Sequence, residues 1–518
     1  MKVALAARPV VTLWVSLVVI FCSCSRKGDP SSLAPPERAE VTVKWVKVLT
    51  VSKTVPTLQV VVNPLLRRGS KIHDRVFQSV RDLGADYIRY ATWVPYPKLA
   101  IPELDPPKDG RTSWDFSLID PMTEDFVNAN AGHPAIFNFG TVPQWMVKTP
   151  EPAPYPADPD QVTWKYLRGT EFRDPTFKEL ADYYGRLVSW YTQGGFTDEY
   201  GQRHESGHHY KIDYWEVLNE VDFEHSLSPE TYTQAYDAIV RSVRKVDPKI
   251  KFVGMVLAGT SPNVGLDLDA PAFFQYFLDH KNHKSGVPLD MISYHCYVTP
   301  TPDETMETAP YAVFEQADHF LDIVRYIQSI RRRLSPETGT VIDEVGSMTA
   351  DDVFGKRTDP FRPIPDAYWN LGGAVYAYIY AQLARFGVEV DGESQLVGFP
   401  SQYPSVSMVD WNTGQPNARF WVLKLIKDHF GPGDKLVESD SHSPYVHAQA
   451  FVTPQGQRRV LLVNKRSRSF EVSLPGLAGS EISYVDQSTG FQPPASLHVT
   501  GNQFTLRPYA VAVVKLPK

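Results

Sequence analysis

The 518-residue sequence predicts an α/β protein, a (β/α)₈ TIM barrel with a C-terminal β-sandwich domain. Between residues 57 and 430, eight short apolar runs alternate with amphipathic helical patterns, as parallel strands joined by crossover helices require. From residue 431 to 518 the helical patterns stop, and short strands separated by turn residues follow. The alternative is an open doubly wound sheet, but NPLLRRGS after the first strand is not a Gly-rich phosphate loop.

The barrel strands are expected at the short apolar runs, which have the length and composition of buried parallel strands. These runs are residues 57–63, 86–93, 134–140, 212–219, 251–259, 289–297, 338–346 and 405–411.

Helical periodicity between these runs predicts one crossover helix after each strand. Gly84 ends the first helix, Pro121 and Gly132 lie near the two ends of the second, and Ser228 with Pro229 begins the fourth. The expected helices are residues 70–84, 117–132, 175–193, 228–245, 273–281, 313–334, 370–387 and 417–431.

The N-terminal segments differ from the barrel and are expected to have other roles. Lys2 and Arg8 precede the apolar run VVTLWVSLVVIFCSCS, so residues 1–24 are interpreted as a signal peptide or lipoprotein leader. Cleavage before Cys24, cleavage before Ser25 and an uncleaved anchor all stay open. Residues 25–40 read as a linker, and residues 41–56 as an N-terminal strand that joins the β-sandwich. The mature chain is expected outside the cytoplasm: secreted, periplasmic or lipid-anchored, with membrane contact only through this leader.

Charge and cysteine content narrow the class of protein. The net charge of -7, from 52 basic and 59 acidic residues, argues against nucleic acid as a partner. Of the three cysteines only Cys296 lies beyond the leader, so no disulfide is expected within the folded part. Oligomeric state is left open.

Two glutamates at predicted strand ends are the strongest chemical feature. In such a barrel the active site lies at the carboxyl ends of the strands. WEVLNE ends on Asn219 and Glu220, and VIDEVG carries Asp343 and Glu344. Cleavage of a glycosidic bond needs two carboxyl groups, which Glu220 and Glu344 provide, although each alone reads as an ordinary surface acid. Neighbouring strand residues face opposite sides, so only one of Asp343 and Glu344 is expected to face the bowl.

Other polar and aromatic side chains stand at the ends of the remaining strands. Indole rings there are expected to stack on sugar rings, although core packing is the alternative. Asp222 and Glu224 are expected to be rim acids that lie past the strand. The expected substrate-binding residues are Asn219, Arg89, His295, Tyr297, Trp93, Asn138, Trp145 and Trp411.

No metal and no organic cofactor are expected. His204, His208 and His209 lie in the polar loop GQRHESGHHYK, without the carboxylate-His helix spacing of a metal site. They are interpreted as part of a solvated rim.

The motifs YWEVLNE and VIDEVG resemble strands four and seven of clan A glycoside hydrolases, in which glutamates at those positions are acid/base and nucleophile. The segments WDFSLID and NFGTVPQW are similar to family 39, which includes β-xylosidases and α-L-iduronidase. The resemblance covers residues 41–518 and includes the barrel followed by a sandwich.

The resemblance implies a role for each matching residue. Glu220 is expected to be general acid and then general base, and Glu344 to attack the anomeric carbon. Asn219 is expected to bind the sugar 2-hydroxyl, and Tyr297 to donate to Glu344. His295 is expected to bind substrate or to orient Glu220, and Arg89 to lie beneath the nucleophile and favour its ionised form.

The resulting hypothesis is an exported retaining glycosidase that acts by double displacement on β-xyloside- or uronide-like oligo- or polysaccharides. Two alternatives use the same sequence features: a surface protein that binds carbohydrate without cleaving it, and a transglycosylase.

Overall fold

The computed structural model describes residues 37–151, 154–166, 169–260, 270–355, 362–398 and 403–517. Residues from Glu37 onward form one compact unit. The expected leader, 1–24, and the linker as far as residue 36 lie outside the described residues. The expected linker extends too far, because β1 (Glu37–Glu40) already pairs with a strand of the C-terminal domain.

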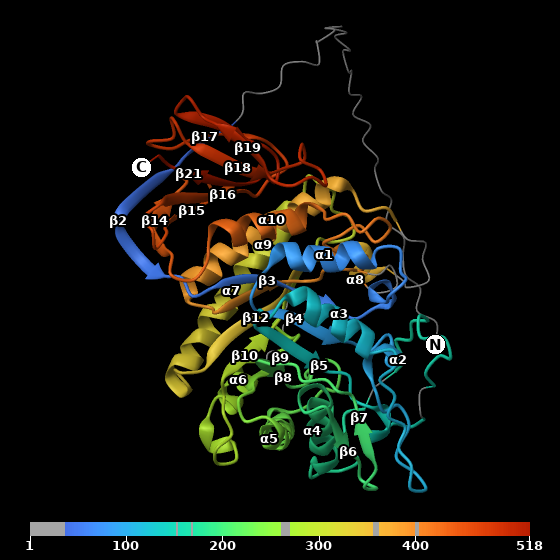
Figure 1. The fold of residues 1–518 in the computed structure, drawn as a ribbon. Coiled ribbons are helices and arrows are strands. Elements are labelled where there is room, and N and C mark those ends of the chain that lie inside the picture. The colour runs from blue at the N-terminus through green and yellow to red at the C-terminus, as the bar shows by residue number, and fades with distance from the viewer. Residues whose placement is uncertain are drawn as a thin grey trace, which may run out of the picture. The chain divides into compact units, whose positions relative to one another are not determined.

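Eight parallel strands close into a barrel, which confirms the predicted fold class (Figure 1). The order around the barrel is β10-β9-β8-β5-β4-β3-β13-β12, and pairing of β10 with β12 closes it. The sixth strand is split by His295 into β10 and β11. The bounds are β3 (Val55–Val61), β4 (Ile88–Thr92), β5 (Ala135–Phe139), β8 (Tyr214–Glu216), β9 (Lys251–Leu257), β10 (Met291–Tyr294), β11 (Cys296–Val298), β12 (Gly339–Ser347) and β13 (Val390–Glu393).

The crossover helices lie where helical periodicity predicts them, within a few residues at each end. Ser228 accepts a hydrogen bond from the Thr231 amide at 3.2 Å, and Gly84 ends its helix with a φ of 54°. The helices of the barrel units are α1 (His73–Leu83), α3 (Asp120–Asn130), α4 (Lys178–Thr192), α5 (Pro229–Val246), α6 (Ala270–Phe277), α7 (Ala309–Leu334), α9 (Asp366–Phe386) and α10 (Ala418–His429). Two short helices, α2 (Pro97–Ala100) and α8 (Ala350–Phe354), lie in strand-to-helix loops.

The eighth strand is not the expected segment 405–411. Residues Pro404–Val406 form a single 3₁₀ turn, and β13 (Val390–Glu393) completes the barrel instead. The sequence VDGE did not read as a buried strand because it carries two acids. Both are fully buried, and Glu393 accepts a hydrogen bond from Arg419 Nε at 2.8 Å. A charge pair of this kind allows a polar strand into the core.

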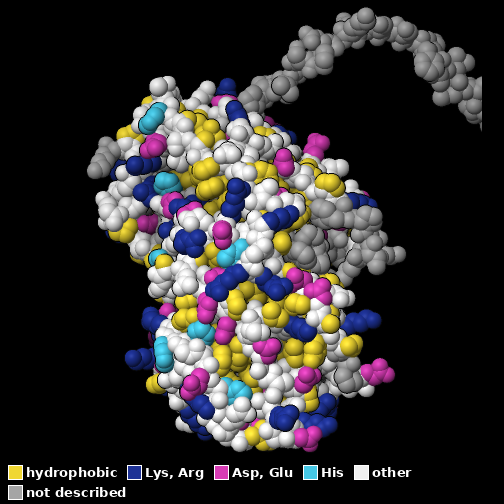
Figure 2. Space-filling model, turned by 45° about the vertical axis from the view of Figure 1, so that its right-hand side comes forward, with side chains coloured by type: hydrophobic (Ala, Val, Ile, Leu, Met, Phe, Trp, Pro, Cys, Tyr) yellow, Lys and Arg dark blue, Asp and Glu magenta, His cyan; other side chains and the backbone are white. Residues whose placement is uncertain are grey.

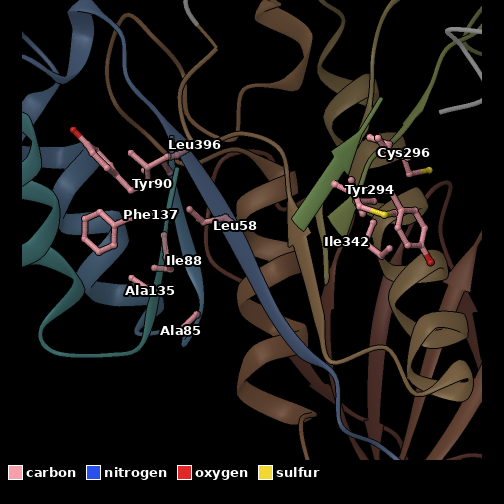
Figure 3. Close-up of a cluster of buried hydrophobic side chains, with 14 of the residues drawn as sticks. Leu58, Ala85, Ile88, Tyr90, Ala135, Phe137, Tyr294, Cys296, Ile342 and Leu396 are labelled. Carbon is pink, nitrogen blue, oxygen red and sulfur yellow. The ribbon is translucent and has the colours of Figure 1, made fainter. Parts of the chain in front are cut away.

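Barrel strands place alternate side chains on two sides. Figure 3 shows outward-facing residues such as Leu58, Phe137 and Ile342, which belong to the large cluster between strands and helices. Residues that face inward from the lower part of the strands form a separate small cluster, composed of Ile136, Tyr214, Val253, Met291, Val341 and Val390. This inner layer is the floor on which the polar upper layer lies.

The C-terminal domain is a sandwich of two sheets, as predicted. A seven-stranded sheet has the order β19-β18-β21-β16-β15-β14-β2, and a three-stranded sheet the order β1-β17-β20. β2 (Thr42–Val51) lies antiparallel to β14 (Figure 1), whereas residues 55–56 of the expected N-terminal strand already belong to β3. The other strands are β14 (Lys435–Asp440), β15 (Val446–Val452), β16 (Arg458–Asn464), β17 (Phe470–Ser473), β18 (Glu481–Val485), β19 (Ala495–His498), β20 (Gln503–Leu506) and β21 (Val511–Lys515).

Acidic and basic side chains are interspersed on the face drawn in Figure 2, with hydrophobic side chains between them. Cys296 is free and buried. None of the helices in the described ranges has the length and hydropathy of a membrane span.

Candidate active site

A cavity of about 290 Å³ opens at the carboxyl ends of the barrel strands and brings Glu220 and Glu344 together. Carboxylate oxygens of the two residues lie within 4.8 Å of each other. Glu220 follows β8 and Glu344 lies on β12, so the two glutamates predicted from strands four and seven share one site. The cavity is lined by Gln59, Val61, Arg89, Ala91, Thr92, Trp93, Asn219, Glu220, Phe223, Ala258, Tyr297, Glu344, Met348, Asp352, Val353, Gly355, Gln395, Tyr403 and Val406.

The chain leaves β8 through a strained turn that aims Glu220. Leu218 and Glu220 have φ angles of 64° and 39°, in the left-handed region that side chains with a Cβ avoid. Asn138 Nδ2 donates to the Leu218 carbonyl at 2.9 Å and holds the turn from the neighbouring strand. A Cβ on Gly140 would lie 2.5 Å from Asn138 Oδ1 and 2.7 Å from Asn219 Cβ, so only glycine permits this close approach.

A β-bulge in β12 directs two consecutive acids inward. Val341 faces the inner layer and Ile342 the outer one, so regular alternation would turn Asp343 inward and Glu344 outward. The register advances three residues on β12, from Ile342 to Val345, while β13 advances only two. The extra residue lets Asp343 and Glu344 both contact Arg89 in the barrel interior. Both acids thus point into the barrel, but the cavity is lined by Glu344 and not by Asp343, so one acid of the pair faces the bowl, as expected.

Arg89 connects the Glu344 carboxylate to the floor of the site. It lies on β4 and only 1% of its side chain is exposed. Its Nη1 donates to Glu344 Oε1 at 2.6 Å, its Nη2 to Asn219 Oδ1 at 2.6 Å, and its Nε to Glu216 Oε2 at 2.5 Å. One guanidinium thus fixes the side chains of strands four and seven relative to each other.

Tyr297 holds the other oxygen of Glu344. Its hydroxyl lies 2.6 Å from Glu344 Oε2 and 2.6 Å from Ser394 Oγ. Gln59 Nε2 donates to Ser394 at 2.6 Å, so the contact is supported from β3. Because each oxygen of Glu344 has its own donor, the carboxylate cannot rotate freely.

His295 lies beneath both glutamates and is fully buried. Its Nδ1 is 2.9 Å from Glu220 Oε1 and 3.4 Å from Glu344 Oε2, and its Nε2 is 3.5 Å from Asp343. Burial opposes a charge on the ring, but the three surrounding carboxylates outweigh it and raise the pKa of His295 well above the ordinary value. The placement favours orientation of Glu220 over direct binding of substrate.

The acids of the site differ in their tendency to hold a proton. Burial, together with the charge of Glu344, raises the pKa of Glu220, although contact with His295 opposes the shift. Burial also raises the pKa of Glu216 well above its usual range. Burial acts the same way on Asp343, but Arg89 and its hydrogen-bonding neighbours outweigh it and lower the pKa of that carboxyl. Glu220, whose pKa is raised, therefore lies beside Glu344, which accepts hydrogen bonds from Arg89 and Tyr297.

Aromatic side chains form one wall of the cavity mouth. Trp93 makes edge contact with Trp164 at 5.4 Å between ring centroids and lies 6.0 Å from Tyr403. Phe223, next to the Asn-Glu turn, is 63% exposed. Trp93 was predicted at this position, whereas Trp164 and Tyr403 lie in long loops whose contacts no periodic pattern encodes.

Four of the eight expected substrate-binding residues line the cavity: Asn219, Arg89, Tyr297 and Trp93. The other four expected residues do not line the described part of the cavity wall. Asn138 and His295 are fully buried beneath the site. Trp145 lines a different cavity. Trp411, expected to end the eighth strand, lies in a turn and packs against the main core, because that strand is β13 instead.

Glu224 is closer to the chemistry than a rim acid. Its Oε1 accepts hydrogen bonds from Asn219 Nδ2 at 2.9 Å and from Trp93 Nε1 at 3.0 Å. Burial and the neighbouring charge of Glu220 raise the pKa of Glu224 to about 8. Asp222, the other expected rim acid, supports the backbone instead. Its carboxylate accepts hydrogen bonds from the backbone amides of Ala258 and Gly259 at 3.0 and 2.7 Å. Because Glu224 lies past the end of the strand, no local pattern signals these contacts.

One group of His and carboxylate side chains within the described ranges has metal-like spacing: Glu220, His295 and Glu344, with ligand atoms within 4.8 Å of one another. Arg89 already donates to Glu344 at 2.6 Å, so a metal ion would compete with this guanidinium for the same carboxylate. The same atoms fit acid/base chemistry better than metal binding.

Comparison with known proteins supports the fold. Residues 444–514 match a family model described as the C-terminal immunoglobulin-like domain of D-apionate lactonase. Among curated proteins, no sequence matches the chain. The structure resembles a GH51 arabinofuranosidase from Xanthomonas axonopodis pv. citri, with a TM-score of 0.60 and 15% identity over 93% of this chain and 100% of that one.

Two further structures cover similar shares of the chain. A glucosidase from Croceicoccus marinus has a TM-score of 0.57 and 16% identity, over 93% of this chain and 99% of its own. A GH39 β-xylosidase from Caulobacter crescentus has a TM-score of 0.55 and 14% identity, over 93% of this chain and 100% of its own. The resemblance to barrel glycoside hydrolases expected from YWEVLNE and VIDEVG is thereby confirmed at the level of the fold.

Proposed function

We propose that the protein is a retaining glycoside hydrolase in which Glu220 and Glu344 carry out a double displacement. The observation that carries the proposal is the approach of their carboxylate oxygens to within 4.8 Å across one cavity. Retaining enzymes place the two carboxyl groups roughly 5–5.5 Å apart, whereas inverting enzymes need about 6.5–9.5 Å to admit a water molecule.

In the first step, Glu344 attacks the anomeric carbon and the bond to the leaving oxygen breaks. Glu220, whose pKa is raised by burial, gives its proton to that oxygen. The product is a glycosyl-enzyme ester on Glu344. In the second step, Glu220 takes a proton from water as the water attacks the anomeric carbon, and Glu344 leaves as the carboxylate.

Arg89, Tyr297 and Asn219 position the reacting groups. Arg89 and Tyr297 hold the two oxygens of Glu344, so its attack needs little reorganisation. Asn219 Oδ1 accepts from Arg89, and one of its amide protons goes to Glu224. Its remaining N–H is then available to donate to a sugar hydroxyl beside the reacting carbon.

A neutral pentoside fits the cavity better than a uronide. In the described part of the wall Arg89 is the only cation, and it is bonded to Glu344. A uronate carboxyl would therefore meet Glu220, Glu344 and Asp352 without a free positive partner. The similar solved structures include an arabinofuranosidase and a β-xylosidase, which is consistent with a pentosyl substrate.

The direct experiment compares Glu344→Ala and Glu220→Ala on aryl β-xyloside, α-L-arabinofuranoside, β-glucoside and β-glucuronide substrates. Both variants are expected to lose turnover of the aryl glycoside that the wild type cleaves. Azide should restore turnover in both: the Glu344 variant should give a glycosyl azide of inverted configuration, and the Glu220 variant one of retained configuration. Equal activity of the Glu344 variant and the wild type would overturn the proposal.

The same assay separates the alternatives. Binding of a glycoside without turnover by the wild type would favour a carbohydrate-binding protein. Transfer of the sugar to an added saccharide acceptor, in preference to water, would identify a transglycosylase with the same two glutamates.

Export is part of the proposal and rests on the sequence of residues 1–24. The basic start and apolar run support a leader, and Cys24 supports lipid attachment. Palmitate labelling of the wild type and of Cys24→Ser, with mass analysis of the mature N-terminus, tests it. Label that depends on Cys24 indicates a lipoprotein, a terminus at Ser25 indicates secretion, and an intact Met1 contradicts cleavage.

A further inference from the structure

A second cavity of about 710 Å³ lies against the first half of α4. It is built from the loop after α2, the turn around Trp145, the entry to α4 and the hairpin of β6 (Gly195–Thr197) and β7 (Arg203–Glu205). Within the described ranges its lining shares no residue with the catalytic cavity. Trp145, expected at the catalytic site, is one of its walls.

Glu103 provides a buried polar group in this cavity. Only 1% of the residue is exposed, and Oε1 has no hydrogen-bond partner among the described residues. A buried oxygen without a partner is costly in a native fold, and a ligand group that bonds to it would remove that cost. Burial and nearby acids raise the pKa of Glu103 to about 8, so at neutral pH the carboxyl both donates and accepts.

Trp145 supplies a flat apolar surface. Its indole N–H donates to the Glu103 carbonyl at 3.0 Å, which fixes the ring plane relative to the buried acid. Pro106, Pro107 and Met146 extend the apolar wall. The C–H face of a pyranose or furanose ring stacks on an indole held in this way, while its hydroxyls reach polar groups at the edge.

The rim of the cavity carries both signs of charge. Arg186 pairs with Glu199 at 3.0 Å, and Lys178 pairs with Asp182. Arg173 is exposed and lines the same rim. Paired charges of opposite sign offer donors and acceptors together, which suits hydroxyl groups. Asp174 and Glu179 add two acids to this lining, so carboxyl groups outnumber cations and an anionic ligand is disfavoured.

We infer that this cavity is a second, non-catalytic saccharide site, in which one sugar ring stacks on Trp145 and hydrogen-bonds to Glu103. The inference rests on the proposed glycosidase function for its ligand class. A site of this kind holds a polysaccharide on the enzyme surface while the catalytic cavity works on another part of the chain, and the gain in local concentration raises apparent affinity.

Binding is tested by affinity electrophoresis of the full chain through gels that contain soluble xylan, arabinoxylan or xyloglucan. Glu344→Gln serves as the background, so that hydrolysis does not destroy the polymer. We expect retardation by at least one polymer, and Trp145→Ala or Glu103→Leu to weaken it about tenfold or more, equivalent to roughly 1.4 kcal/mol. Glu103→Gln keeps a donor and an acceptor and should bind nearly as the background does. Arg173→Glu changes an exposed rim residue and should weaken binding without disturbing the fold.

Trp421→Ala is the matched control, because Trp421 is also half-buried and donates to a backbone carbonyl, that of Phe491, at 3.1 Å. It should not affect retardation. In the active enzyme, Trp145→Ala should leave kcat/KM on a small aryl glycoside unchanged. The inference would be overturned if the background protein bound none of the three polymers. It would also be overturned if the Trp145→Ala, Glu103→Leu and Arg173→Glu variants were retarded as strongly as the background. If the wild type hydrolysed none of the aryl glycosides, that result would instead count against the proposed function.

Discussion

His295 Nδ1 lies 2.9 Å from Glu220 Oε1, and the imidazole is completely buried. Glu344 lies 3.4 Å from the same nitrogen, and Asp343 lies 3.5 Å from the other. These three acidic side chains raise the pKa of a ring whose pKa burial alone would lower. The proton affinity of Glu220 is therefore a balance: burial and Glu344 raise its pKa, and His295 lowers it.

This balance predicts pKa shifts of opposite sign in two variants. Glu344→Gln removes the negative charge that raises the pKa of Glu220, so the titration of Glu220 should move to lower pH. His295→Gln removes the imidazole whose contact lowers that pKa, so the titration should move to higher pH. Carbon-13 NMR of labelled glutamate carboxyls measures both midpoints. Shifts of the same sign in the two variants would contradict the arrangement.

The proposed role of Glu220 as proton donor predicts that activity depends on the leaving group. Glu220→Ala should slow cleavage of an alkyl glycoside by about 10²–10⁴-fold, the usual contribution of general acid catalysis. A dinitrophenyl glycoside needs no proton on its leaving oxygen, so formation of the glycosyl-enzyme should be nearly normal. Pre-steady-state release of dinitrophenol measures this step. Asp222→Asn, next to the same turn, provides the control. Any change in its rate should be the same for the alkyl and the dinitrophenyl glycoside.

The hydrogen bonds of Glu224 predict a positioning role for its carboxyl. Its Oε1 accepts from both Asn219 and Trp93. Glu224→Gln keeps an acceptor at that place and should retain most of the activity. Glu224→Leu leaves the Asn219 amide group without this acceptor and should lower kcat/KM by roughly 10–100-fold, as loss of one or two buried hydrogen bonds implies.

A substrate without the 2-hydroxyl distinguishes this role from a general loss of stability. If Glu224 acts by orienting Asn219 toward that hydroxyl, Glu224→Leu should affect the 2-deoxy substrate much less than the parent glycoside. An equal loss on both substrates would mean that Glu224 supports the fold of the site instead.

The barrel was predictable because seven of its strands are apolar runs between helices with ordinary caps, such as the Ser228 helix. The eighth strand was missed because β13 buries Asp391 and Glu393, and a polar run reads as a loop until its partner is known. Arg419, which pairs with Glu393, is 26 residues away in a helix. Local pattern contains no information about such a pair.

The two glutamates of the site were predictable because each ends a buried strand. The contacts that hold these two glutamates in place were only partly predictable. The contacts of Arg89 and Tyr297 with Glu344 were expected from the resemblance, whereas the floor position of Asn138 depends on the strained turn at Leu218. The inward direction of both Asp343 and Glu344 depends on a bulge, which a strictly alternating strand model excludes. Single-residue shifts of register arise from the pairing of two strands, so neither strand shows them alone.

Replacing each of the two buried acids of β13 by its amide should change the stability of the protein in opposite directions. Neither carboxylate oxygen of Asp391 has a hydrogen-bond partner among the described residues, and burial raises its pKa well above the ordinary value. Because its folded pKa exceeds the unfolded value of about 3.9, stability is lost as pH rises through and beyond pH 4. Asp391→Asn removes this loss, so it should stabilise the protein at pH 8 by on the order of 1–3 kcal/mol, and less at pH 5.

Glu393→Gln is the contrasting change on the same strand. Burial raises the pKa of Glu393 to about 7, although Arg419 opposes the shift. The amide cannot neutralise Arg419, whose guanidinium is fully buried, so the variant should be less stable than the wild type at pH 8. Urea unfolding at pH 5 and pH 8 measures both variants. If the stability difference between Asp391→Asn and the wild type stayed constant over this range, Asp391 would already be ionised in the folded protein, contrary to its surroundings.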